Sequence, residues 1–287
     1  AGRTFQSSEL VKIFFCLTFG KHLDTLRKKG LIDNPLHVVL LGCHALVPML
    51  LCELQGDTGA AVVFFAMFVV MSLAAHVKLR YFAVLGGLVL IAIPILWQFV
   101  MDEYQKARIV ALFNLDNVEV QANEGYQQYQ GMISIGSGKF SGQGLFQGSR
   151  VASNSVPFQQ SDYIFSVAGE ELGFVGCSLV LLLLFLLMVK VLHVAHVSRD
   201  GIGKTICFGY FGIIALQSVS NIGMCLALLP VMGVTLPFFS AGGSSAICMY
   251  LGVGLVQSVY MRRQESDGLR LHRKLPIRLP YKGMKQA

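Results

Sequence analysis

Charged side chains are scarce in this 287-residue chain: Asp, Glu, Lys and Arg make up 14% of it, whereas hydrophobic residues make up 54%. Residues 205–261 contain no Asp, Glu, Lys, Arg or His. That stretch is long enough for two membrane crossings, since a spanning helix needs about 20 largely apolar residues. With a mean hydropathy of +0.61, the composition excludes an ordinary soluble domain and predicts an all-α, polytopic membrane helix bundle.

Two further signals are missing. The cysteines all fall inside apolar stretches, so the sequence predicts no disulfide framework. The glycine-rich run 136–148 does not fit a nucleotide-binding loop, because Lys139 is followed by Phe and no strand-to-helix context surrounds it. We interpret the region instead as part of a flexible, substrate-covering loop. Three basic residues of the outer loop would contact phosphate: Arg108, Lys139 and Arg150.

Seven apolar stretches are candidates for membrane crossings. We expect them at about 8–26, 36–54, 58–77, 80–100, 163–190, 205–230 and 244–261. A large polar loop, 101–161, separates the fourth crossing from the fifth. The sequence therefore predicts a membrane-embedded domain over 1–261, followed by a basic tail, 262–287.

Lys and Arg are concentrated on one side of this topology. The connections on that side hold 17 of the 23 Lys and Arg residues; they are 21–34, 76–80, 190–204 and 262–287. The short connections on the other side, 53–58 and 231–243, hold none. The positive-inside rule makes the basic side cytoplasmic and places the large loop outside. We expect the basic tail to contact anionic membrane lipid and no nucleic acid.

A carboxylate stands where the large loop meets the fifth apolar stretch. An ionisable group at the mouth of a membrane segment marks a functional site by default, which makes Asp162 the first candidate. At helical spacing, its face also carries Ser166, Gly169, Gly173 and Gly176. Such a small, polar face suits close packing or a cavity. Position alone leaves open whether Asp162 has a functional role or caps the helix.

Other candidates lie at the same predicted outer face. Glu9 and Lys12 are one helical turn apart; they form either an interior ion pair with a functional role or a surface pair. Asp57 precedes an apolar stretch, where it can cap the helix or bind substrate. The turn before the last crossing carries Ser244 and Ser245, where free backbone amides suit a lipid phosphate, although ordinary capping is the alternative.

Several motifs together resemble one family. FQSSELVK at 5–12 resembles F-Q-P-S-E-x-x-K, and QGDTG at 55–59 resembles Q-P-D-x-G-T. Residues 157–176 resemble P-x-x-H-T-D-F-I-F-A-x-x-x-E-E-L-G-x-x-G. Residues 126–138 and 221–245 are similar to the start of the family's outer loop and to its C-terminal signature. In this order, over nearly the whole chain, the motifs resemble the SEDS (shape, elongation, division and sporulation) family, which includes RodA and FtsW.

The resemblance implies a fold of ten transmembrane helices, of which this chain matches the last seven, so we expect three further helices before residue 1. It implies a peptidoglycan glycosyltransferase that polymerises lipid II on the outer face of the bacterial plasma membrane. Asp162 matches the family's catalytic carboxylate, and a class B penicillin-binding protein is the expected partner. Gly56, Gln160 and Ser161 depart from the family's Pro, His and Thr, which affects contacts around the site rather than the aspartate.

Two functions of other classes stay open. A flippase for lipid-linked precursors would carry polar residues at mid-membrane depth; the acidic residues here gather at the outer end, with His44 as the main exception. A scaffold of the wall-synthesis complex would not need Asp162. The sequence indicates no metal site, although a divalent cation as cofactor stays open, as does the choice between elongation and division.

Overall fold

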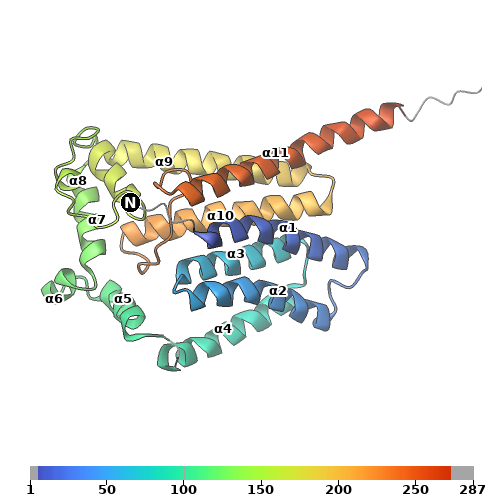
Figure 1. Cartoon of the computed structure of the whole chain (residues 1–287), viewed down its shortest axis with the longest axis horizontal. Coiled ribbons are helices and arrows are strands. Elements are labelled where there is room, and N and C mark those ends of the chain that lie inside the picture. Colours follow the sequence, from blue (N-terminus) through green and yellow to red (C-terminus); the bar gives the residue numbers. More distant parts are fainter. Residues whose placement is uncertain (1–5, 100, 273–287) are drawn as a thin grey trace, which may run out of the picture.

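The computed structural model describes residues 6–99 and 101–272, and all regular secondary structure in that part is helical (Figure 1). The long helices are α1 (Ser7–Lys28), α2 (Pro35–Leu54), α3 (Thr58–Ala74), α4 (Leu79–Phe99), α9 (Ile164–Val197), α10 (Gly201–Cys225) and α11 (Gly243–His272). The shorter ones are α5 (Glu103–Phe113), α6 (Val118–Ala122), α7 (Tyr126–Ser137) and α8 (Ser149–Ala152). The predicted all-α fold class is confirmed.

A helix covers each predicted crossing. Five helices are long and apolar enough to cross a membrane: α2, α4, α9, α10 and Gly243–Arg262 of α11. Of the other two, α3 has only 17 residues, and α1 is interrupted by charged residues such as Lys12 and Asp24. The multi-pass membrane protein is confirmed. The division into a membrane domain and the tail 262–287 stays a prediction, because much of that tail lies outside the described residues.

Three helices end five or more residues from where the apolar pattern predicts. α11 runs to His272, past residue 261, so the helix continues into the predicted tail. α9 runs to Val197, past residue 190, because the sequence beyond Lys190 stays largely apolar. α10 ends at Cys225 instead of residue 230. There the amides of Leu228 and Leu229 both donate to the carbonyl of Gly223, at 2.7 and 3.1 Å, which turns the chain out of the helix.

The centre of the bundle is α10. It packs against α1, α3, α9 and α11. In its most apolar 18-residue stretch, 67% of the residues are buried. Small residues permit this close approach: a Cβ added at Gly209 would lie 2.7 Å from Met71 Sδ and 2.9 Å from Cys16 Sγ. By contrast, α4 has no buried residue and runs along the edge of the bundle in Figure 1. Its exposed apolar surface suits contact with lipid.

The segment predicted as a flexible loop, 101–161, contains four helices. α5 to α8 gather at one end of the long helices (Figure 1). Among them, α7 packs directly against α9. A glycine-containing stretch between α7 and α8, the inserted loop (residues 138–144), then enters a break in α9. The segment therefore forms a cover built on the bundle rather than an independent loop.

The break in α9 lies at Gly173, which has φ 65° and ψ −162°. The carbonyls of Glu170 and Glu171 accept hydrogen bonds from the amides of Gln143 and Gly144, at 2.9 and 3.0 Å. A Cβ added at Gly173 would lie 2.3 Å from the amide nitrogen of Gly142. At the break, hydrogen bonds from the backbone of the inserted loop thus take the place of hydrogen bonds within α9.

This break corrects one prediction from helical spacing. The helix begins at Ile164, after Asp162, and is not regular at Gly173. A single face that runs from Asp162 through Gly173 to Gly176 is therefore wrong. Regular spacing fails here because hydrogen bonds from a distant segment decide the local backbone.

Candidate active site

Asp162 lies in the turn that leads into α9. Its amide donates to the carbonyl of Phe158 at 3.1 Å. The N-cap of α9 is the next residue, Tyr163, and this helix start has no side-chain capping hydrogen bond. The capping role considered for Asp162 is therefore wrong, and its half-buried carboxylate is available for another task.

The loop between α10 and α11 borders the carboxylate. A Cβ added at Gly233 would lie 3.8 Å from Asp162 Oδ2, and Gly233 has φ +64°. Two hydrogen bonds fix this loop beside the turn. Ser240 Oγ donates to the carbonyl of Ser161 at 2.5 Å, and the amide of Ala241 donates to the carbonyl of Gln160 at 2.8 Å. The turn before α9 and the loop before α11 thus form one unit.

Asn221 of α10 forms hydrogen bonds to both parts of this unit. Its Nδ2 donates to the backbone carbonyls of Asp162 and Val234, both at 2.7 Å, and the residue is fully buried. The partners of this side chain are thus the backbone of two loops.

Burial and charge act on Asp162 in opposite directions. Burial raises the pKa of the Asp162 carboxyl above its ordinary value, while a hydrogen bond from Ser161 and the positive charge of Arg108 lower it; the burial effect is larger. Arg108 belongs to α5, and its Nη1 donates to the carbonyl of Val231, in the loop before α11, at 3.3 Å. The guanidinium also lies over the ring of Tyr104, 4.3 Å from its centroid. Arg108 is the predicted basic residue that the structure brings to the carboxylate.

Arg150 and Lys139 have other surroundings. The Arg150 side chain donates from Nε to Ser134 Oγ at 3.1 Å and from Nη2 to Gln130 Oε1, so it joins α8 to α7. Its backbone amide donates to Glu170 Oε1 at 2.7 Å. Lys139 is exposed at the inserted loop, where its carbonyl accepts from the amide of Phe174 at 3.0 Å.

Glu9 and Lys12 form a buried ion pair. Lys12 Nζ lies 2.7 Å from Glu9 Oε1, and the two side chains are only 2% and 5% exposed, respectively. Glu9 Oε2 is buried without a hydrogen-bond partner among the described residues. The predicted interior pair is confirmed, and the surface alternative is wrong.

Asp57 links three helix ends. Its Oδ1 accepts from the amide of Ala60 at 3.0 Å, which confirms the predicted cap of α3. Its Oδ2 accepts from Gln6 Nε2 at 2.8 Å and from Ser8 Oγ at 3.1 Å. The backbone amide of Gln6 in turn donates to Ser244 Oγ at 3.4 Å. The starts of α1, α3 and α11 therefore meet on one face, as the predicted topology requires.

Ser245 is buried, and its Oγ lies 3.1 Å from Thr235 Oγ1. The hydroxyls of both predicted serines are thus engaged by protein groups. Only their neighbouring backbone amides at the start of α11 match the predicted anion site. Phosphate binding there remains a prediction.

Glu170 is not among the predicted site residues, although its surroundings are unusual. Its side chain is fully buried within the apolar helix, and Oε2 has no hydrogen-bond partner in the part of the chain that is described. The signal was present as an acidic pair, Glu170 and Glu171, inside a membrane helix. Within the described residues, no group of three His, Cys, Asp or Glu is placed to hold a metal ion.

A bundle of apolar helices long enough to cross a membrane, with a half-buried carboxylate near one end, defines the class: a polytopic membrane protein. The family model for cell cycle proteins of the FtsW, RodA and SpoVE type matches residues 1–265. The chain belongs to this family, and the SEDS resemblance is confirmed.

Two relatives with assigned names show the same likeness. The peptidoglycan glycosyltransferase MrdB of Escherichia coli K12 is 32% identical over 261 residues, covering 91% of this chain and 69% of the relative. The probable peptidoglycan glycosyltransferase FtsW of Geobacter sulfurreducens is 32% identical over 262 residues, covering 91% and 68%.

Solved structures agree with the fold. A chain of a peptidoglycan synthase complex that coordinates polymerization and crosslinking superposes with a TM-score of 0.71 at 27% identity, covering 90% of this chain and 70% of that one. The rod shape-determining protein RodA of Thermus thermophilus gives a TM-score of 0.61 at 26% identity, covering 90% and 66%. The helical arrangement described above is thus the family's arrangement.

Proposed function

We propose that Asp162 is the general base of a glycosyl transfer at the outer face of the membrane. The activity follows from membership of the family: the chain is a peptidoglycan glycosyltransferase that acts in cell shape or division. One observation carries the assignment of the base. Asp162 is a half-buried carboxylate with a raised pKa, held by its backbone beside a cation, where the loop before α11 meets α9.

The proposed substrate is lipid II. Asp162 takes the proton from the 4-hydroxyl of the acceptor's GlcNAc, and that oxygen attacks the anomeric carbon of the donor's MurNAc. The bond to undecaprenyl pyrophosphate breaks, and the pyrophosphate leaves with the electron pair. Because the attack comes from the face opposite the leaving group, an α-linked donor gives a β linkage. A raised pKa makes the carboxylate a stronger base than an ordinary aspartate.

The leaving pyrophosphate needs positive charge nearby. Arg108 is the residue best placed to supply it, since its charge already acts on Asp162. Lys139 is exposed on the inserted loop and free to meet a substrate phosphate from the solvent side. We assign Arg150 a supporting role, because its guanidinium is engaged by Gln130 and Ser134.

The remaining outer-face residues shape the wall of the site. Glu9 and Lys12 are buried against each other, so we propose that they position α1 rather than touch the lipid. Asp57 likewise holds α1 on α3 through Gln6 and Ser8. For Ser244 and Ser245, the start of α11 offers backbone amides to a phosphate while the hydroxyls hold neighbouring segments.

The orientation and the partner belong to the same proposal. The basic connections favour a cytoplasmic position for the end of the bundle away from Asp162. A class B penicillin-binding protein is the proposed partner. The likeness to one chain of a peptidoglycan synthase complex, which couples polymerization to crosslinking, supports it.

The flippase alternative is less well supported. One polar contact lies deep in the helices, where His22 Nδ1 and His44 Nδ1 are 3.2 Å apart. The acidic and basic groups around Asp162 all lie at one end instead. Purified protein with its partner in detergent, supplied with lipid II, separates the two functions. An enzyme makes glycan strands there, whereas a flippase makes none, because detergent offers no second leaflet.

A further inference from the structure

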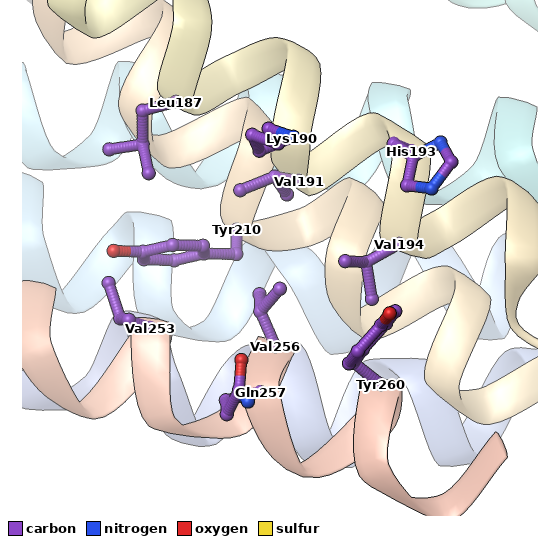
Figure 2. A pocket seen from close by; sticks show the side chains of 10 residues that line it. All are labelled: Leu187, Lys190, Val191, His193, Val194, Tyr210, Val253, Val256, Gln257 and Tyr260. Carbon is purple, nitrogen blue, oxygen red and sulfur yellow. The ribbon is translucent and has the colours of Figure 1, made fainter. Parts of the chain in front are cut away.

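A cavity lies away from the proposed reaction centre, between the later parts of α9 and α11. Its volume is about 330 Å³. Figure 2 shows side chains of α9 on one side and of α11 on the other, with the ring of Tyr210 from α10 between them. The proposed glycosyl transfer does not use this cavity.

The lining changes from apolar to polar along the helices. At one end lie Leu187, Val253 and the Tyr210 ring (Figure 2). Toward the other end come Lys190 and His193 of α9, with Gln257 and Tyr260 of α11. None of the lining residues is acidic. The cavity is thus apolar at one end and carries a cation and hydrogen-bonding groups at the other.

The direction of this change matches a membrane leaflet. α9 is broken at Gly173, so the rise is counted from there: Lys190 lies 17 residues further on, about 25 Å along the helix at 1.5 Å per residue. The hydrocarbon core is about 30 Å thick. The polar end of the cavity therefore lies near the far edge of that core, on the side opposite Asp162, where a long side chain such as Lys190 reaches the headgroups. The apolar end points into the hydrocarbon.

The back wall of the cavity is fixed in advance. Tyr210 is buried, and its hydroxyl donates to the carbonyl of Met249 at 2.7 Å. A Cβ added at Gly252 would lie 2.0 Å from a ring carbon of Tyr210, so only glycine admits the ring this close to α11. A preformed wall lowers the ordering cost of binding a ligand.

A second cavity extends the basic character of this end. It has a volume of about 320 Å³ and lies between the start of α10 and α11. Arg199 and Arg262 line it, together with one acidic residue, Asp200. Basic groups between membrane helices on the cytoplasmic side are a known setting for anionic lipid headgroups.

We infer that the cavity between α9 and α11 binds one anionic phospholipid of the inner leaflet. The phosphate lies among Lys190, Gln257 and Tyr260, and the first part of an acyl chain runs over Leu187 and Val253. The volume is at the lower end of the range for ligand sites, which suits one headgroup and the carbons next to it. The assignment to the inner leaflet rests on the proposed orientation; the site itself does not depend on the glycosyl transfer.

Three variants of the whole chain test the site. Lys190→Gln removes the cation at an exposed position, and Val253→Trp fills the apolar end without a change in charge. Lys29→Gln is the matched control, since Lys29 is an exposed basic residue at the end of α1, on the same predicted side, and lines neither cavity. Each protein is titrated in neutral detergent with dioctanoyl phosphatidylglycerol, with the thermal unfolding midpoint and native mass spectrometry as readouts.

The wild type and Lys29→Gln are expected to bind phosphatidylglycerol equally, and more tightly than phosphatidylcholine of the same chain length. Lys190→Gln weakens binding about fivefold, and Val253→Trp loses the bound lipid. Glycerol phosphate alone gives no shift, because the acyl chain contributes.

Three results would overturn the proposal. They are equal binding of the two lipids, unchanged binding in both cavity variants, and a full shift with glycerol phosphate or inorganic phosphate alone, which would assign the site to a free phosphate. Lipid II polymerisation is not among these readouts, so a failed lipid site and a failed enzyme assignment are told apart.

Discussion

Asn221 Nδ2 lies 2.7 Å from the backbone carbonyl of Asp162 and 2.7 Å from that of Val234. One buried amide in the central helix therefore joins the turn that carries the proposed base to the loop that borders it. The side chain of Asp162 remains available for a substrate because its backbone, and not its carboxylate, makes these contacts.

Asn221→Leu is expected to reduce glycosyl transfer about 10–100-fold. Both carbonyls lose a buried hydrogen bond, at about 1–3 kcal/mol for each group left unsatisfied, and the carboxylate loses its fixed position. The measurement is the lipid II polymerisation rate of the purified complex. Gln217→Met is the matched control one turn earlier, where the buried Oε1 already lacks a partner among the described residues. Equal losses in the two variants would contradict the positioning role.

The Glu9–Lys12 pair gives a stability prediction. Lys12→Met leaves Glu9 buried without its counter-ion, which is expected to cost about 3–5 kcal/mol of unfolding free energy. The double variant Glu9→Gln, Lys12→Met recovers a large part of that loss, because no uncompensated charge remains. Thermal or denaturant unfolding in detergent measures both.

The chain offers a control at the same spacing for this pair. Lys106 and Glu103 also form an i,i+3 ion pair, 2.8 Å long, but the Glu103 side chain is 92% exposed. Lys106→Met is expected to cost less than about 1 kcal/mol. If Lys12→Met cost no more than Lys106→Met, burial of the Glu9–Lys12 pair would have no energetic consequence.

Gly173→Ala tests the insertion into α9. A Cβ there meets the backbone of Gly142 at 2.3 Å, and φ is +65°. A residue with a Cβ pays about 1–3 kcal/mol for this backbone conformation, which is almost confined to glycine, and the clash adds to it. We expect faster proteolysis within residues 138–148 and a loss of activity. Gly136→Ala in α7, where no atom lies within 4 Å of the added Cβ, should leave both unchanged. Wild-type protease resistance in Gly173→Ala would contradict the described break.

The raised pKa of Asp162 gives a pH prediction. A base must be deprotonated, so the rate falls as pH drops through the pKa of Asp162, and that fall is expected at higher pH than for an ordinary aspartate. The positive charge of Arg108 lowers this pKa. Arg108→Gln should therefore move the acidic limb of the pH–rate profile to still higher pH, whatever its effect on the maximal rate. Lys106→Gln is the control, and a limb that stays in place in Arg108→Gln would argue against the coupling.

Local signals in the sequence were sufficient for several features. Asp57 caps α3 because a cap needs only its own side chain and amides three residues on. The spacing of Glu9 and Lys12 predicts their contact for the same reason. Their burial, however, depends on how α1 packs against neighbouring helices such as α10 and α11, which no local pattern contains.

The features that sequence reasoning missed depend on distant segments. The break at Gly173 exists because residues 139–144 bond to the backbone of α9, while the sequence around it still favours an uninterrupted helix. Arg150 resembled a phosphate-binding residue, yet Gln130 and Ser134 of α7 accept its hydrogen bonds. The sequence makes Asp162 a candidate by its position at a membrane boundary. The structure adds that its side chain does not cap α9, and its catalytic role stays a prediction.

The most direct test of the account is the polymerisation rate of Asp162→Asn. The substitution keeps the size of the side chain and leaves the backbone bond from Asn221 in place, so expression and partner binding should stay normal. Loss of a general base is expected to lower the rate on the order of 10²–10⁴-fold. Asp116→Asn, an exposed carboxylate in the same cover, should polymerise lipid II as the wild type does. If Asp162→Asn also polymerised at the wild-type rate, Asp162 would not be the catalytic base.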